Sequence, residues 1–139
     1  ARKADATMYL GPLPAWAAPL ADRLTADGYM PTRADQLIVN EYEPGQGISA
    51  HVDCVPCFGP SICSVTLGSH CLIEFSAVNS AMSAELLLER GSLLALTGEA
   101  RYDYRHAIPG RKSDRVDGQL RERSRRVSLT FRTVIVSKE

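Results

Sequence analysis

Two residue types that bind iron in proteins lie close together in the run Ile48-Ser-Ala-His-Val-Asp53. On an extended strand, His51 and Asp53 would point to the same face, because residues two apart share a side. An imidazole beside a carboxylate supplies two ligands of a 2-His-1-carboxylate triad, which binds non-heme Fe(II) and leaves the opposite positions open. His106, in another strand-like run, is the natural third ligand, whereas His70 lies at a predicted hairpin turn and is interpreted as structural.

The run Arg-Val-Ser-Leu-Thr-Phe-Arg at 126–132 would place both arginines and both hydroxyl residues on one face of a strand. One interpretation is a half-exposed strand whose polar face is in water. The other is a site for a small dianion, because guanidinium groups bind carboxylates through paired hydrogen bonds and hydroxyl groups add donors. Asn40 and Tyr42, also two residues apart, could offer an amide and a phenol to the same ligand.

The spacing of apolar residues predicts one helix followed by many short strands. Trp16, Leu20 and Leu24 recur at helical spacing within 15–26, and Gly28 follows where a helix would end. The predicted strands are 36–42, 48–53, 62–67, 71–75, 84–88, 92–96, 102–108 and 126–136. Strands at this spacing favour a β-sandwich or barrel over alternating βαβ units. The polar segment 109–125 is predicted to be a long loop, a kind of segment that is often functional.

The chain of 139 residues has no net charge, with 16 basic and 16 acidic residues, but the two signs are unevenly distributed. The segment 101–132 contains ten basic and four acidic residues, so the remainder is net acidic. This asymmetry indicates an anionic partner such as nucleic acid. A basic surface that is simply solvated is the other interpretation.

Length and cysteine content narrow the class of protein further. A chain of this length fits one domain, and no apolar run approaches the roughly 18 residues that cross a bilayer. No secretory signal is visible, so we expect an intracellular protein, cytoplasmic or nuclear, whose four cysteines are reduced. We also expect a monomer. Cys54-Val-Pro-Cys57 could form half of a zinc site, but no second ligand pair follows.

The run 40–53 as a whole resembles the signature of the AlkB family of Fe(II)/2-oxoglutarate dioxygenases. Three further segments agree with that family in order and approximate spacing: 64–68, 90–102 and 126–132. The similarity extends from about Leu13 to Val134. It is greatest to the subgroup that contains the eukaryotic tRNA wobble-uridine hydroxylase and its bacterial relatives.

The resemblance implies a mainly β fold, a double-stranded β-helix (jelly-roll) core with one or two N-terminal helices. It also implies roles for eight residues. Three match the family's iron ligands: His51, Asp53 and His106. Five match positions that hold 2-oxoglutarate: Arg126, Ser128 and Tyr42 at the distal carboxylate, and Arg132 and Asn40 at the end that chelates the metal.

The implied reaction uses O2 and couples oxidative decarboxylation of 2-oxoglutarate to hydroxylation of a substrate C–H bond. We expect a demethylase of alkylated bases in DNA or RNA. The alternatives are a hydroxylase of a modified tRNA uridine, an enzyme acting on a protein or small molecule, and a metal-binding jelly-roll without turnover. The intact set of His51, Asp53 and His106 with Arg126 and Arg132 disfavours the last of these, since a protein without turnover has no need of all five.

Two departures from the family bear on the substrate. Members that repair alkylated bases often have an acidic residue two positions beyond the iron-binding Asp, and here that residue is Val55. The family's nucleotide-recognition lid lies mostly before the core, where this chain has only about 40 residues. We therefore expect one domain, 1–139, that lacks part of the lid.

Overall fold

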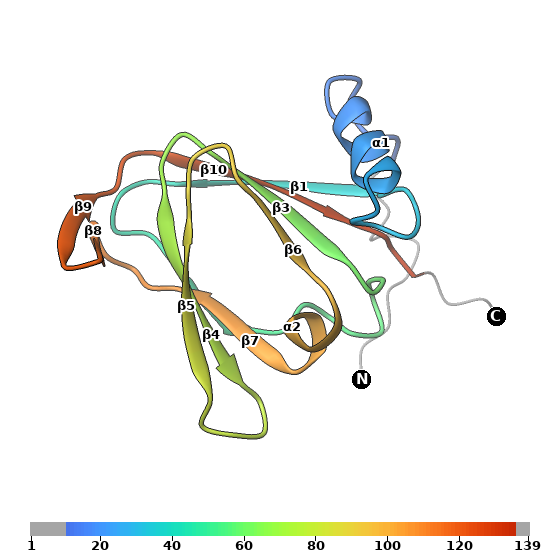
Figure 1. The fold of residues 1–139 in the computed structure, drawn as a ribbon. Coiled ribbons are helices and arrows are strands. Elements are labelled where there is room, and N and C mark those ends of the chain that lie inside the picture. The colour runs from blue at the N-terminus through green and yellow to red at the C-terminus, as the bar shows by residue number, and fades with distance from the viewer. Residues whose placement is uncertain (1–10, 136–139) are drawn as a thin grey trace.

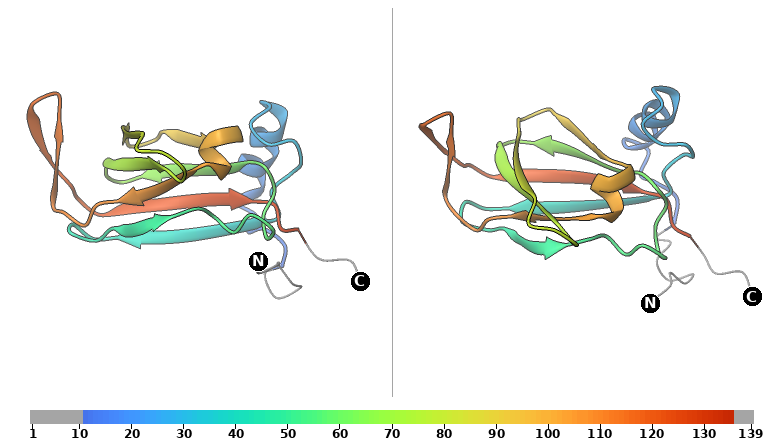
Figure 2. Two further views of the ribbon diagram at one scale, coloured as in Figure 1. Left: turned by 90° about the horizontal axis from the view of Figure 1, so that it is seen from below. Right: turned by 60° about the horizontal axis from the view of Figure 1, so that its bottom comes forward.

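The computed structural model of the chain describes residues 11–135. Its main strands are β1 (Gln36–Tyr42), β2 (Ile48–His51), β3 (Ile62–Leu67), β4 (Cys71–Ala77), β5 (Ser83–Leu88), β6 (Leu93–Leu96), β7 (Tyr104–Ile108) and β10 (Arg126–Arg132). They form two four-stranded antiparallel sheets, with strand orders β1-β10-β3-β6 and β2-β7-β4-β5. The two sheets form layers of one jelly-roll, and the mainly β fold predicted from the sequence is confirmed (Figures 1 and 2).

Strand β10 lies between β1 and β3, and both of its faces are covered. Its apolar side chains, Val127, Leu129 and Phe131, pack in the core beneath the N-terminal helix. Its polar side chains alternate with these and therefore face the space between the two sheets. Arg126 and Ser128 are buried there. The half-exposed interpretation of this strand is wrong, because the second sheet covers its polar face.

The N-terminal helix, α1 (Ala18–Ala26), packs against one end of the outer face of the first sheet (Figure 1). It begins three residues later than predicted, with Pro19 in its first turn, and Gly28 follows with φ of 83°. Its buried face carries Ala17 and Ala21 in addition to Leu24. Trp16 and Leu20, which suggested the helix, are exposed, because Ala17, Ala21 and Leu24 form the face that packs on the sheet.

Other boundaries also differ from those predicted. A short helix, α2 (Gly98–Tyr102), precedes β7, so that strand begins two residues later than expected. Strand β2 ends at His51 rather than at Asp53. Strand β10 ends at Arg132, and the predicted end of that strand, at 136, lies outside the described residues. No helix within 11–135 combines the length and the apolarity that crossing a bilayer requires.

The predicted loop 109–125 contains a β-hairpin, formed by β8 (Ser113–Val116) and β9 (Gln119–Glu122). Figures 1 and 2 show it at the end of the molecule opposite α1. The turn residues, Asp117 and Gly118, have φ of 49° and 77°. Asp-Gly is a preferred pair for a two-residue turn with positive φ at both positions. This signal was present in the sequence and would have predicted the hairpin.

A buried carboxylate anchors this hairpin. Asp114 is fully buried and accepts hydrogen bonds from Arg123, at 2.8 Å to each oxygen, and from Arg111 at 3.0 Å. Burial raises the pKa of Asp114, but the bonds from the two arginines outweigh it and lower the pKa overall. His70, interpreted as structural, is buried with its Nε2 3.5 Å from the same carboxylate. Arg111 and Arg123 therefore neutralise an internal charge.

Candidate metal and cosubstrate site

The two histidines of the predicted triad lie opposite each other on adjacent strands. β2 and β7 pair antiparallel with His51 in register with His106, and the ring centroids are 4.3 Å apart. Asp53 lies two residues beyond the end of β2, so a loop rather than the strand directs its side chain toward them. One potential ligand atom from each of the three residues lies within 4.8 Å of the others. The geometry is that of a 2-His-1-carboxylate group.

The ring nitrogens are arranged so that both Nε2 atoms face Asp53. The Nδ1 of His51 lies 2.8 Å from the main-chain oxygen of Ser49 and donates to it. When the ring is neutral, that bond leaves the lone pair on Nε2. The hydrogen bond to Asp53 raises the pKa of His51, so a metal ion that binds Nε2 would displace a proton from it. The Nε2 atoms of His51 and His106 are 3.2 Å and 3.6 Å from Oδ1 of Asp53. Three donor atoms therefore surround one point.

The second oxygen of Asp53 is held by a different group. Nη1 of Arg132 donates to Oδ2 at 3.3 Å. Burial alone would raise the pKa of Asp53, but the hydrogen bond from His51 and the charge of Arg132 lower it to about 2. Burial and the neighbouring His51 lower the pKa of His106. An ionised carboxylate and a neutral imidazole are the protonation states that bind a metal ion.

A cavity of about 180 Å³ lies between the sheets beside this group. Its walls include apolar side chains from both sheets, among them Ile62, Ile73 and Leu94. All eight residues predicted for the site line it: Asn40, Tyr42, His51, Asp53, His106, Arg126, Ser128 and Arg132. The fold thus brings the complete predicted set into one cavity, while the role of each residue stays a prediction.

Arg126 is the charged group whose environment is incomplete. Its side chain is 5% exposed, donates to Thr66 Oγ1 at 2.9 Å and lies over the ring of Tyr42. Its Nε is buried, and no group in the described part of the chain accepts a hydrogen bond from it. No carboxylate within 11–135 forms an ion pair with it. A buried, uncompensated guanidinium is costly, so this end of the cavity fits a carboxylate ligand such as 2-oxoglutarate.

Arg132 and Asn40, predicted to hold the metal-chelating end of 2-oxoglutarate, differ in how firmly they are placed. Besides Asp53, Arg132 contacts Gln36 Oε1 at 2.8 Å and stacks on the ring of Phe58 at 4.0 Å. Asn40 is exposed where it lines the cavity. Arg132 therefore has a partner on the triad itself, and only part of its guanidinium is free to meet a ligand.

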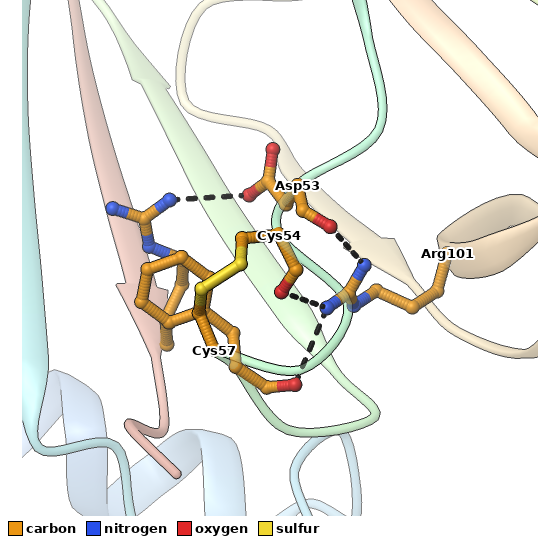
Figure 3. Close-up of a disulfide and its surroundings, with 6 residues drawn as sticks. Asp53, Cys54, Cys57 and Arg101 are labelled. Atoms are coloured by element: carbon orange, nitrogen blue, oxygen red, sulfur yellow. Dashed lines mark hydrogen bonds and ion pairs between the residues drawn. A yellow bond between two sulfur atoms is a disulfide. The ribbon is translucent and has the colours of Figure 1, made fainter. Parts of the chain in front are cut away.

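Two cysteines next to Asp53 form a disulfide, so the expectation that all four cysteines are reduced is wrong for this pair. A turn in which the Cys57 amide donates to the Cys54 carbonyl at 3.2 Å brings the two α-carbons to 5.1 Å, within bridging distance (Figure 3). The bridge also excludes the zinc alternative for this pair. Cys63 and Cys71 are free and buried, as expected for reduced thiols, and burial raises the pKa of Cys63 to about 11.

Removing the bridge is expected to lower the free energy of unfolding by about 2 kcal/mol. The effect is modest because the bridge closes a loop of only four residues, which removes little conformational entropy from the unfolded chain. The double variant Cys54→Ala/Cys57→Ala would be compared with wild type by urea denaturation without reductant. Wild type treated with a phosphine reductant is the control, since it opens the bridge without changing a side chain. Equal midpoints for all three samples would contradict the prediction.

Arg101 lies beside the site, but the sequence predicts no role for it beyond its place in the segment 90–102. Its side chain is 2% exposed and projects from α2 toward the loop that carries Asp53 (Figure 3). It donates hydrogen bonds to four main-chain carbonyls of 53–59. A charged residue in a short polar helix gives no sequence signal of burial, so only the fold identifies it.

Comparisons with known proteins agree with this geometry. The family described as the 2OG-Fe(II) oxygenase superfamily matches residues 2–132. The tRNA (carboxymethyluridine(34)-5-O)-methyltransferase ALKBH8 of Mus musculus is 36% identical over 89% of this chain and 21% of its own length. The alkylated DNA repair protein ALKBH8 homolog of Arabidopsis thaliana is 36% identical over 96% of this chain and 45% of its own length.

The probable RNA/DNA demethylase ALKBH6 of Danio rerio is 32% identical over 88% of this chain and 63% of its own length. The chain therefore spans less than two thirds of these relatives. The solved structure of OsALKBH1 has a TM-score of 0.65 at 20% identity, over 87% of this chain and 66% of that one, which supports the jelly-roll fold. From the family match, the relatives and the fold together, the chain belongs to the 2OG-Fe(II) oxygenase superfamily and, within it, to the AlkB family.

Proposed function

We propose that this chain is an Fe(II)- and 2-oxoglutarate-dependent dioxygenase that oxidatively demethylates alkylated bases in nucleic acid. One observation supports the proposal most strongly. Arg126, buried and without a carboxylate partner in the described residues, lines the same cavity as the group His51, Asp53 and His106. A dicarboxylate that reaches from a metal to an arginine would satisfy both ends of the cavity.

In this proposal His51, Asp53 and His106 hold the iron. Asp53 is suited to donate one oxygen, Oδ1, because Oδ2 is engaged by Arg132. The bond from His51 Nδ1 to Ser49 keeps the ring in the tautomer that presents Nε2. These contacts orient the donors of Asp53 and His51 before the metal arrives.

Arg126 would hold the distal carboxylate of 2-oxoglutarate, with Ser128 and the phenol of Tyr42 beside it. The apolar side chains of the cavity would cover the methylene carbons and keep water away. When bound, iron with 2-oxoglutarate and O2 supplies the oxidising power that hydroxylates a substrate C–H bond and releases succinate and CO2. On an N-methyl group, the hydroxymethyl product then releases formaldehyde and leaves the unmethylated base.

Nucleic acid as the substrate is supported by the names of the relatives, which refer to tRNA, DNA and RNA. Basic groups on the surface are the expected phosphate contacts. Arg121 and Arg125 form exposed ion pairs, with Glu89 and Glu41 respectively. Exposed pairs add little to the stability of the fold, so either arginine can exchange its glutamate for a phosphate. A base within a duplex would have to leave the stack to reach the metal. We expect such a substrate to be met in the cytoplasm or the nucleus.

The test is an assay with Fe(II), 2-oxoglutarate and ascorbate on methylated single- and double-stranded oligonucleotides. Succinate and formaldehyde should form in equal amounts, with unmethylated oligonucleotides of the same sequence as the control. Succinate formation that no oligonucleotide stimulates would indicate a protein or small-molecule substrate. Failure to bind 2-oxoglutarate in the presence of metal would overturn the enzymatic proposal itself.

The second candidate is hydroxylation of a modified tRNA uridine. Val55, exposed on the loop after Asp53, offers no acceptor where base-repairing members of the family often have an acidic residue. The similarity to the mouse tRNA methyltransferase also favours this candidate. Its product would retain the substituent and gain one oxygen atom, so mass spectrometry of digested tRNA without formaldehyde release would distinguish it.

A further inference from the structure

Arg101 has an unusual environment for a charged residue. Among the side chains of the described residues that are almost completely buried, that of Arg101 is the largest. No carboxylate within 11–135 forms an ion pair with it, and its aromatic neighbour is Tyr102, at 4.7 Å from the ring centroid. Its burial is compensated instead by main-chain dipoles, because carbonyl oxygens accept from all three guanidinium nitrogens.

The carbonyls that accept these bonds belong to one short segment. Nη1 donates to the carbonyl of Asp53 at 2.8 Å, and Nε donates to that of Gly59 at 3.2 Å. Nη2 donates to the carbonyls of Cys54 and Phe58, each at 3.3 Å. Figure 3 shows the guanidinium reaching from α2 into the curve of the loop that the disulfide closes. Arg101 thus holds both ends of 53–59.

Main-chain hydrogen bonds to 133–135 and a β-bridge from Phe58 to Val134 hold one end of the segment 53–59, but the sheet does not fix its other end, at Asp53. His51 and His106 are in register on paired strands, so the ladder sets the distance between the two imidazoles. Asp53 lies beyond the last residue of β2. The disulfide constrains the loop within itself but does not connect it to β7. Arg101, five residues before His106 in the chain, makes that connection.

The geometry points to Arg101 as a positioning residue that holds the main chain of Asp53 in reach of the metal and in register with the two histidines, while Arg132 bonds to the Asp53 side chain. Arg101 acts through the main chain and touches neither the metal nor a substrate. The inference rests on the metal site of the proposed function. Residues that orient metal ligands typically change metal affinity 10- to 100-fold when they are replaced.

The experiment measures Mn(II) binding by calorimetry and the absorption spectrum of the Co(II) form, each below the unfolding temperature of every variant. Arg101→Met keeps the length of the side chain and removes its donors, and Arg101→Lys restores the charge with fewer donors. Arg123→Met is the matched control, because Arg123 is also buried but bonds to Asp114, outside the triad. Melting temperatures are recorded for all variants.

For Arg101→Met we expect Mn(II) affinity to fall about 10- to 100-fold and the Co(II) spectrum to change. Arg101→Lys should recover part of the affinity. Arg123→Met should melt at a lower temperature than wild type yet bind Mn(II) as wild type does. If Arg101→Met melts earlier but keeps the affinity and spectrum of wild type, its role is purely structural and the inference is overturned.

Two further outcomes are also decisive. If Arg101→Met does not fold, Arg101→Lys is judged by the same comparison, and wild-type affinity in that variant would contradict the inference, because an ammonium cannot reproduce the four bonds. If wild type itself binds neither Mn(II) nor Co(II), the metal site of the proposed function fails. If wild type binds metal and Arg101→Met binds it with the same affinity, only the positioning role of Arg101 is rejected.

Discussion

Replacing Asp53 with alanine is expected to reduce iron-dependent succinate release by at least about 100-fold, a loss at the upper end of that seen when groups supporting a metal ligand are removed. The variant loses the one anionic donor of the triad and leaves the positive charge of Arg132 without its carboxylate partner. The fold should persist, because Arg101 bonds to the main-chain carbonyl at position 53 rather than to the side chain.

The measurements are succinate release, Mn(II) affinity and the melting temperature of the same preparations. Asp103→Ala is the matched control, because Asp103 is an exposed aspartate that lies outside the cavity. Its turnover should equal that of wild type. Retained turnover in Asp53→Ala, together with unchanged Mn(II) affinity, would remove Asp53 from the ligand set.

Replacing Arg126 with methionine is expected to weaken 2-oxoglutarate binding by about 3–5 kcal/mol, or roughly two to four orders of magnitude in Kd. The loss is large because the ligand's carboxylate would enter a buried site with no opposite charge. The ligand-free variant should melt no earlier than wild type, since the guanidinium it lacks has no carboxylate partner in the described residues and its buried Nε bonds to no acceptor there. If Arg126 were merely structural, its replacement would lower the melting temperature and leave 2-oxoglutarate binding unchanged.

Calorimetric titration of the Mn(II) form with 2-oxoglutarate, without O2, measures the Kd. Arg125→Met is the control from the neighbouring position: Arg125 is exposed, pairs with Glu41 and should not affect the affinity. An unchanged Kd in Arg126→Met would mean that the cosubstrate binds elsewhere in the cavity, and the assignment of Arg126 would be withdrawn.

The sequence predicts those parts of the site that depend on strand alternation. The polar residues of 126–132 share a face because side chains alternate on any strand, and the same rule places Asn40 beside Tyr42. The helix was recognisable because its apolar residues recur with a period near 3.6 and a glycine follows it. These signals are local, and a single segment is enough to establish each of them.

Contacts between distant segments could not be predicted in this way. Arg101 bonds to carbonyls more than 40 positions away, and a main-chain acceptor has no sequence signature. Asp53 reaches the triad although its strand ends at His51, so the prediction of its direction was right for a different reason. The Cys54–Cys57 bridge depends on the turn between the cysteines, which cellular context alone does not predict.

The bridge between Cys54 and Cys57 places a disulfide, which reductants can open, beside the proposed site of a redox-active iron. Cys54 follows Asp53 directly, so the sulfur lies one residue from the carboxylate proposed to hold ferrous iron. Dithiothreitol and related thiols, often added to keep iron ferrous, also exchange with disulfides, whereas ascorbate does so poorly. Protein stored in a thiol is therefore expected to contain the open form of this loop, and protein stored in ascorbate the bridged form. The choice of reductant would then decide which form meets the metal proposed to bind beside it.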